Sequence, residues 1–235
     1  MVFGKYDLDV TLAEDGVKIV VEDAGKRKRY YRKCGKEEVE KFIHADTGRI
    51  VVCPVEPVNI PLPNPAEHLQ IELDKPLIVA SGERDTFYTT FPVEVGVFLV
   101  DRKDVERIDL FTKTKPKFTL YGPPESGIVC KWWQSSIYSE PPKVKKLREG
   151  VFKVDIRNEY HEWMEIQKLV FCGHEMKMFY NDHAYLHGFI KIQKRTVGDT
   201  GFISRKPKDM HGSIDIHLAK GLKRLENYVM EWGFK

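Results

Sequence analysis

The sequence lacks the features that mark export or membrane insertion. Its longest apolar stretches, such as residues 95–100, are far shorter than the roughly 20 residues that a membrane-spanning helix needs. Residues 1–9 are charged and contain no apolar run of the kind found in a signal peptide. We therefore expect a soluble, cytoplasmic protein without a membrane span.

Cysteine is scarce, and its spacing excludes the common cysteine sites. No two cysteines form the C-x-x-C pair of a zinc ribbon or a dithiol redox centre. The four lie far apart in the chain: Cys34, Cys53, Cys130 and Cys172. We expect free thiols in a reducing compartment.

An excess of charge of one sign is also missing, since 38 basic and 35 acidic residues leave a net charge of +3. Such a balance disfavours a dedicated nucleic-acid-binding domain, which is usually strongly basic. Hydrophobic residues make up 42% and aromatic residues 11% of the chain, which is ordinary for a packed core. The length suits one large β-rich domain over residues 1–235.

Local signatures of catalysis are absent as well. The chain has no H-E-x-x-H zinc motif and no G-x-S-x-G nucleophile elbow. Residues 122–127 have the G-x-x-x-x-G spacing of a phosphate loop, but Ile128 and Val129 follow where Lys and Ser or Thr are required. These absences favour binding over catalysis, although an active site assembled from distant residues leaves no local motif.

The dominant pattern that is present is alternation of apolar and polar residues, which is typical of half-solvated antiparallel strands. It occurs at three sets of positions: Leu69, Ile71 and Leu73; Phe152, Val154 and Ile156; Ile214, Ile216 and Leu218. Residues 93–100 are apolar on nearly both faces and predict a central strand. With frequent turn signals, the pattern predicts about a dozen short strands stacked as an all-β, mainly antiparallel β-sandwich.

Prolines mark two candidate sub-boundaries, near residues 54–65 and near residues 139–150. Proline removes a donor from the strand ladder, so we expect loops that cross between sheets there.

One amphipathic α-helix is predicted at the C-terminus, because apolar residues recur there at spacings of three and four. They are Leu218, Leu222, Leu225, Val229 and Trp232. The pattern would also fit a coiled-coil seam between subunits, but two heptads fall short of a sustained repeat. We expect the helix to pack on its own sheet.

Four segments resemble those of an archaeal family of uncharacterised proteins of about this length: residues 53–63, 91–98, 114–122 and 147–152. The resemblance covers most of the chain, from about residue 39 to the end. It implies an archaeal cytoplasmic source and supplies no catalytic residue.

Histidines gather between residues 161 and 187, and imidazole and carboxylate are common metal ligands. The candidate ligands are His161, His174, His183 and His187. On a strand, residues four apart share a face but lie about 13 Å apart, so His183 and His187 could share an ion only if a turn intervened. We favour surface and turn histidines and predict no cofactor. A divalent metal in a hydrolase or a cupin-like enzyme is the alternative.

A second set of residues supplies cations, a hydroxyl and flat apolar rings of the kind used in binding faces. Its members are Lys115, Lys117, Tyr121, Lys131 and Trp132. Hairpin packing beside a solvated lysine row is the favoured interpretation, and a ligand-binding face is the alternative.

The basic segment over residues 26–33 interleaves cations with Tyr30 and Tyr31, a pattern that suits single-stranded nucleic acid. A charged hairpin tip that protects a sheet edge is favoured instead. The sequence thus leaves the function open. Our best hypothesis is a binding or interaction module without catalytic activity, and a homodimer through an edge strand or the C-terminal helix is compatible with it.

Overall fold

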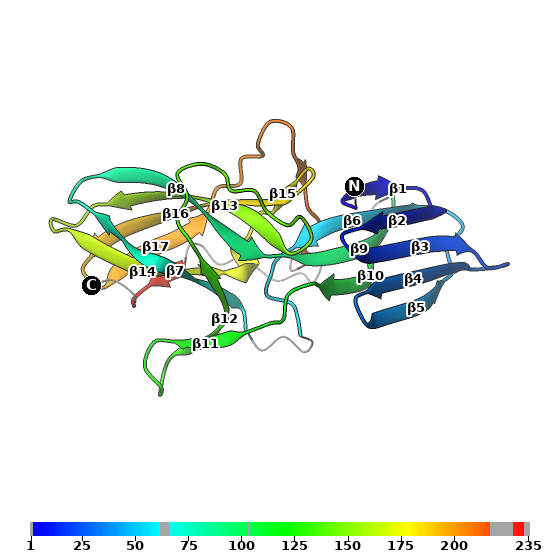
Figure 1. The fold of residues 1–235 in the computed structure, drawn as a ribbon, viewed down its shortest axis with the longest axis horizontal. Coiled ribbons are helices and arrows are strands. Elements are labelled where there is room, and N and C mark those ends of the chain that lie inside the picture. Colours follow the sequence, from blue (N-terminus) through cyan, green and yellow to red (C-terminus); the bar gives the residue numbers. More distant parts are fainter. Residues whose placement is uncertain (1, 62–65, 103, 217–227, 233–235) are drawn as a thin grey trace.

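The computed structural model describes residues 2–61, 66–102, 104–216 and 228–232. Figure 1 shows an elongated molecule in which two stacks of β-sheets lie end to end. We call them the N-terminal sandwich and the C-terminal sandwich. The all-β, mostly antiparallel architecture predicted from the alternation is confirmed.

The N-terminal sandwich contains two four-stranded sheets. One is a meander of β2 (Val10–Glu14), β3 (Val17–Asp23), β4 (Lys28–Cys34) and β5 (Glu37–Ile43). The other has the order β1 (Gly4–Tyr6), β6 (Arg49–Val55), β9 (Glu94–Asp101) and β10 (Asp104–Thr112). Asp15 and Gly16, both at positive φ (50° and 73°), form the tight turn between β2 and β3, as type I′ hairpins require.

A buried polar contact fixes how these two sheets stack. Asp109 on β10 accepts hydrogen bonds from the Tyr30 hydroxyl at 2.8 Å and from the Arg32 Nε at 2.6 Å, both on β4. Period-two alternation therefore sends Tyr30 and Arg32 inward, and their neighbours Tyr31 and Lys33 outward.

The C-terminal sandwich also has two sheets. One has the order β11 (Phe118–Tyr121), β12 (Ile128–Ser135), β7 (His68–Val79) and β14 (Met164–Cys172). The other contains β18 (His211–Gly212), β15 (Phe179–Tyr180), β16 (Ala184–Lys194), β13 (Glu149–Asn158) and β8 (Arg84–Pro92). Beside β16 lies β17 (Val197–Phe202), and β19 (Tyr228–Met230) pairs with β17. A single 3-10 turn, η1 (Gly173–Glu175), follows β14.

The ring of Phe152 on β13 fills the space between these sheets. Its centroid lies 4.8 Å from that of Phe171 on β14 and 6.4 Å from that of Phe91 on β8. A Cβ at Gly188 of β16 would come within 2.9 Å of this ring, so only glycine fits beside it. The same apolar cluster continues into the N-terminal sandwich.

The two sandwiches are joined at Val93, where β8 of the C-terminal sandwich passes into β9 of the N-terminal sandwich. Strand β9 corresponds to the central strand predicted over residues 93–100. The Glu94 side chain has no exposed surface, and its carboxylate accepts hydrogen bonds from the backbone N–H groups of Asn59 at 3.0 Å and Ile60 at 3.1 Å. It also forms an ion pair with Lys131 of β12, which is 1% exposed. Burial raises the pKa of Glu94, although Lys131 and the two amides act in the opposite direction.

The structure corrects three sequence-based predictions. Residues 228–230 form strand β19 against β17 where the C-terminal helix was expected, while residues 217–227 lie outside the described part. A strand was predicted over residues 214–218, but residues 214 and 215 have no regular secondary structure. Two pairings, β13 with β16 and β12 with β7, are parallel, because the chain returns to these sheets after long crossovers.

The predictions of inter-sheet loops and of free cysteines are supported by the described residues. Of the predicted loops near residues 54–65 and 139–150, residues 56–61 and 139–148 do connect sheets, whereas Pro54 lies inside β6 and residues 149–150 begin β13. The four cysteines are free thiols. Within the described residues, no helix has the length and apolar character needed to cross a membrane.

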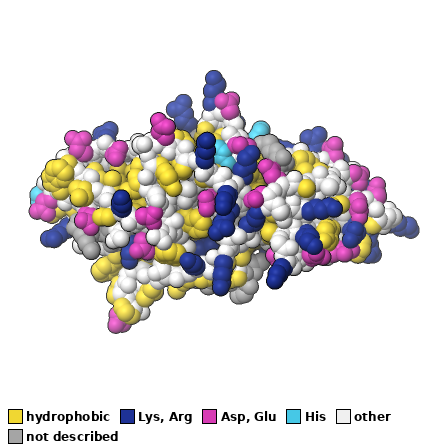
Figure 2. Space-filling model, in the orientation of Figure 1, with side chains coloured by type: hydrophobic (Ala, Val, Ile, Leu, Met, Phe, Trp, Pro, Cys, Tyr) yellow, Lys and Arg dark blue, Asp and Glu magenta, His cyan; other side chains and the backbone are white. Residues whose placement is uncertain are grey.

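The hairpin formed by β11 and β12 projects from the body of the molecule (Figure 1). Its outer side carries three exposed apolar residues, Phe118, Leu120 and Val129, with exposed fractions of 39%, 42% and 46%. Figure 2 shows this apolar projection, and also a group of Lys and Arg side chains between the two sandwiches.

The ion pair at the junction predicts a large effect of Lys131→Met on stability. Removal of the lysine leaves Glu94 as an uncompensated buried charge, so we expect a loss of about 3–5 kcal/mol in the free energy of unfolding, measured with urea. Adding Glu94→Gln should restore part of this loss.

Lys33→Met is the matched control, because the Lys33–Glu38 pair has a similar geometry, at 2.6 Å, but is half exposed. It should cost less than about 1 kcal/mol. Equal effects of the two lysine substitutions would contradict a structural role for the buried pair.

Candidate functional site

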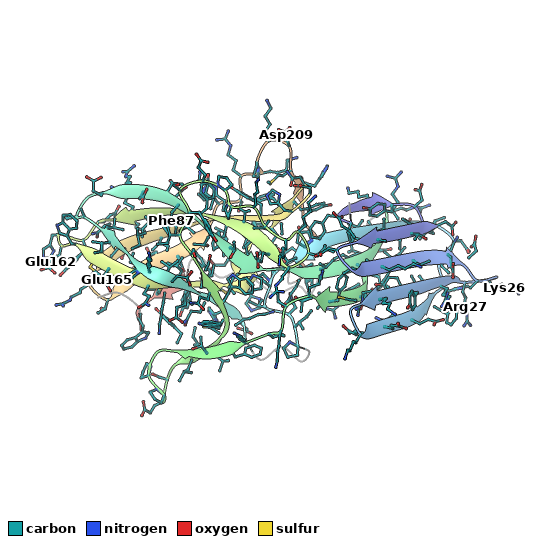
Figure 3. The ribbon with its side chains drawn as sticks, viewed as in Figure 1. Lys26, Arg27, Phe87, Glu162, Glu165 and Asp209 are labelled. Atoms are coloured by element: carbon teal, nitrogen blue, oxygen red, sulfur yellow. The ribbon has the colours of Figure 1, made fainter. Side chains whose placement is uncertain are left out.

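The outer face of the sheet β8–β13–β16 has side chains arranged in rows across the three strands. Alternation turns Phe87, labelled in Figure 3, and Ile156 into the core, and leaves their neighbours on the outer face. The register sets three rows: Tyr88, Lys153 and His187; Thr86, Asp155 and Phe189; Arg84, Arg157 and Lys191. Adjacent strands lie about 4.8 Å apart, so each row spans roughly 10 Å.

A shallow hollow of about 560 Å³ lies on this face. It is lined by Arg84, Asp85, Thr86, Lys153, Asp155, Ile156, Arg157, Phe189, Ile190 and Lys191. Four of these residues are basic and two are acidic, so the hollow favours a negatively charged ligand.

A hydrogen-bond network holds the centre of the face. Asp155 Oδ2 lies 2.7 Å from His187 Nε2, and Asp155 Oδ1 accepts the Thr86 hydroxyl at 2.8 Å. Burial alone would raise the pKa of Asp155, but the hydrogen bonds from His187 and Thr86 outweigh it and lower the pKa. The carboxylate therefore stays ionised and fixes the orientation of the imidazole.

The row formed by Arg84, Arg157 and Lys191, which we call the basic row, is only partly neutralised by acidic side chains. Glu159 pairs with Arg157 at 3.1 Å and with Lys191 at 2.9 Å, so one carboxylate serves two cations. Arg84 is exposed and forms no ion pair within the described residues. The three cations therefore keep unused hydrogen-bond donors toward solvent.

The opposite end of the face is aromatic. Tyr88 lies beside Lys153 and pairs through its backbone with Tyr138, whose exposed fraction is 37%. Tyr185 follows on β16, where burial raises the pKa of its phenol to about 12. The Tyr185 phenol therefore stays neutral at physiological pH, and the three rings offer flat apolar surfaces.

Most of the ligand-binding residues predicted from the sequence make separate contacts and do not form one site. Lys131 is buried against Glu94, and the Tyr121 hydroxyl donates to the carbonyl of Trp232. Lys117 lies over the Trp132 ring, 4.9 Å from its centroid, whereas Lys115 is exposed in a loop. Only Lys117 and Trp132 come together, and a ligand role for this set stays a prediction.

The predicted metal-ligand histidines also lie apart, each beside a different carboxylate. The pairs are His161 with Glu162, His174 with Glu67, His183 with Asp182 and His187 with Asp155. In the part of the chain that the structure describes, no three His, Cys, Asp or Glu side chains gather in a way that could hold a metal ion. A metal site at these histidines stays a prediction without geometric support.

The basic segment at residues 26–33 is extensively paired with acids. Lys28 contacts Asp23 at 2.7 Å, and Arg29 bridges Glu22 and Glu40 at 2.7 and 2.9 Å. Lys26 and Arg27 lie at the far tip of the N-terminal sandwich (Figure 3). This pairing matches the expected charged hairpin better than a nucleic-acid surface.

Sequence reasoning missed the basic row. Alternation puts Lys153 and Arg157 on the outer face of β13, but Arg84 and Lys191 join them only through the register of β8 and β16. Cross-strand register depends on which cores pack together, and a single sequence does not display it.

The comparisons with known proteins give one match. A family model described as "Protein of unknown function (DUF432)" matches residues 2–231. No curated protein and no solved structure matches the chain.

The network around Asp155 predicts that Thr86→Val raises the pKa of this carboxyl. A folded-state pKa below the unfolded value of about 3.9 stabilises the fold above that pH, and the stabilisation is lost as the pH falls through the folded pKa. The variant should therefore lose stability at pH 7 but not at pH 2, as thermal melts would show, and carbon NMR titration would report the pKa.

Thr47→Val is the control, because the Thr47 hydroxyl donates a similar hydrogen bond to Asp101 at 2.9 Å in the N-terminal sandwich. It should leave the Asp155 titration unchanged. An unaltered Asp155 pKa in Thr86→Val would show that the threonine does not hold this carboxylate.

Proposed function

This chain belongs to the family of unknown function DUF432, and we propose that it binds an anionic ligand on the outer face of β8, β13 and β16. The observation that supports this most directly is the row of Arg84, Arg157 and Lys191 across three neighbouring strands. The row borders a hollow on the sheet face.

The chemistry of the row suits phosphate or carboxylate groups. Guanidinium presents its donors as a planar fork that matches the oxygens of either group, and Lys191 adds a mobile point charge. Binding would replace the shared contacts to Glu159 with charge-assisted hydrogen bonds to the ligand. Arg84, which lies near Glu159 without a direct ion pair among the described residues, would gain a direct anionic partner.

The shape of the site favours an elongated ligand with several anionic groups. A flat sheet face cannot enclose a small molecule, so affinity must come from contacts spread over more than one row. The aromatic end around Tyr88 and Tyr185 would support the apolar part of such a ligand. Phosphorylated chains and acidic oligosaccharides share this chemistry.

Binding is favoured over catalysis by the state of the central network. The Thr86 hydroxyl donates to Asp155, but the lowered pKa of this carboxylate makes it a weak general base for activating the hydroxyl. The residues that line the hollow include no serine or cysteine. An enzyme that uses the His187–Asp155 pair stays the alternative.

Calorimetry with two probes, tripolyphosphate and a short oligogalacturonate, tests this proposal. We expect binding that weakens with salt, and Arg84→Glu combined with Arg157→Glu should weaken it at least tenfold because two charge-assisted contacts become repulsive. The preferred probe would identify the ligand class.

Lys18→Glu combined with Lys36→Glu is the charge-matched control, since both lysines are exposed in the other sandwich. It should leave binding unchanged. Equal losses in the control, or no binding of either probe at low salt, would reject the proposal.

Other expectations from the sequence stay predictions: a cytoplasmic location, an archaeal source and a homodimer. The edge position of β11 is compatible with such a dimer, because an edge strand leaves backbone donors and acceptors available for pairing.

A further inference from the structure

A second, smaller cavity lies where the end of β6 meets β15 and the segment over residues 212–215. Its volume is about 150 Å³, several times the roughly 30 Å³ that one water occupies in the liquid. It is lined by Glu56, Met176, Lys177, Met178, Phe179, Ser204, Gly212, Ser213, Ile214 and Asp215. None of these residues lines the hollow on the outer face.

Two buried oxygen atoms at this cavity have no hydrogen-bond partner. Glu56 is only 2% exposed, and its Oε2 atom is one of them. The other is the Oγ atom of Ser213. An unpaired buried polar group is unfavourable, so two of them at one cavity point to an occupant that forms hydrogen bonds with both.

The cavity gains a negative charge when Glu56 ionises, and that charge favours a positive occupant. Asp215 shares a hydrogen bond with the Glu56 carboxyl and pairs with Lys177 at 3.1 Å. Lys177 thus offsets the charge of Asp215, and Glu56 has no cation of its own among the described residues when it is ionised. Burial, followed by the nearby Asp215, raises the pKa of Glu56 to about 9, and the thiol of Cys53 also faces this carboxyl.

We propose that this cavity binds the protonated amino group of an aliphatic amine. An ammonium group has three N–H donors, and the cavity presents three acceptors: Glu56 Oε2, Ser213 Oγ and the Asp215 carboxylate. The site is distinct from the anion-binding face and does not depend on the function proposed there.

The walls of the cavity distinguish an amine from a metal ion. Two carboxylates and one hydroxyl are fewer hard ligands than calcium usually takes. Met176, Met178, Phe179 and Ile214 instead form an apolar lining that would cover an alkyl chain. A methylene chain ending in ammonium matches both parts of this lining.

Proton release accompanies binding in this account. Glu56 is protonated at neutral pH in the empty cavity and must ionise to pair with ammonium, with Asp215, Lys177 and Cys53 as the charged or titratable neighbours. The apparent affinity should therefore rise up to about tenfold per pH unit between pH 7 and pH 9.

Calorimetry with 1,4-diaminobutane tests the proposal, with 1,4-butanediol as the neutral isostere and calcium as the metal probe. We expect the diamine to bind, the diol and calcium to bind at least tenfold more weakly, and the diamine heat to vary with the ionisation enthalpy of the buffer. Equal binding of diamine and diol, or tighter binding of calcium, would overturn the assignment.

Glu56→Gln keeps the shape of the side chain and should weaken diamine binding at least tenfold and abolish the buffer dependence. Glu162→Gln is the control, because that glutamate is exposed at the far end of the C-terminal sandwich (Figure 3). If Glu56→Gln fails to fold, the buffer dependence of the unaltered protein still decides. Diamine binding without proton release at pH 7 would contradict the role of Glu56.

Discussion

The ion pair between Lys131 and Glu94 connects parts of the chain that no local interaction would hold together. Glu94 opens β9 of the N-terminal sandwich, Lys131 belongs to β12 of the C-terminal sandwich, and the amides of Asn59 and Ile60 bind the same carboxylate from the crossing loop. A charge buried this deeply is tolerated only when its partners are all in place. The pair therefore fixes where β8 ends, where β9 begins and how the two sandwiches meet.

The outer face of β8, β13 and β16 depends on that arrangement through the core beneath it. Phe152 packs against Phe171 and Phe91, and this packing sets the register of β13 against both neighbours. If β13 slipped by one residue against its neighbours, its inner and outer side chains would exchange faces, and Arg157 would no longer lie in line with Arg84 and Lys191. The candidate binding face is thus a consequence of interior packing, with its charges placed by residues that never reach the surface.

Local patterns predicted the local features well. Alternation located β13 from Phe152, Val154 and Ile156, all of which are buried. It could not show that β13 pairs in parallel with β16, or that His187 would meet Asp155. The helical spacing near the C-terminus was misleading at Tyr228–Met230, because pairing with β17 outweighs intrinsic periodicity.

The central claim is that the C-terminal sandwich presents a preformed anion-binding face. Amide chemical-shift mapping of the full chain during titration with tripolyphosphate tests it most directly. The account predicts saturable shifts concentrated on β8, β13 and β16 around Arg84, Arg157 and Lys191, with little change on β2–β5. Shifts centred on the basic tip at residues 26–33, or spread evenly over all exposed lysines, would contradict it.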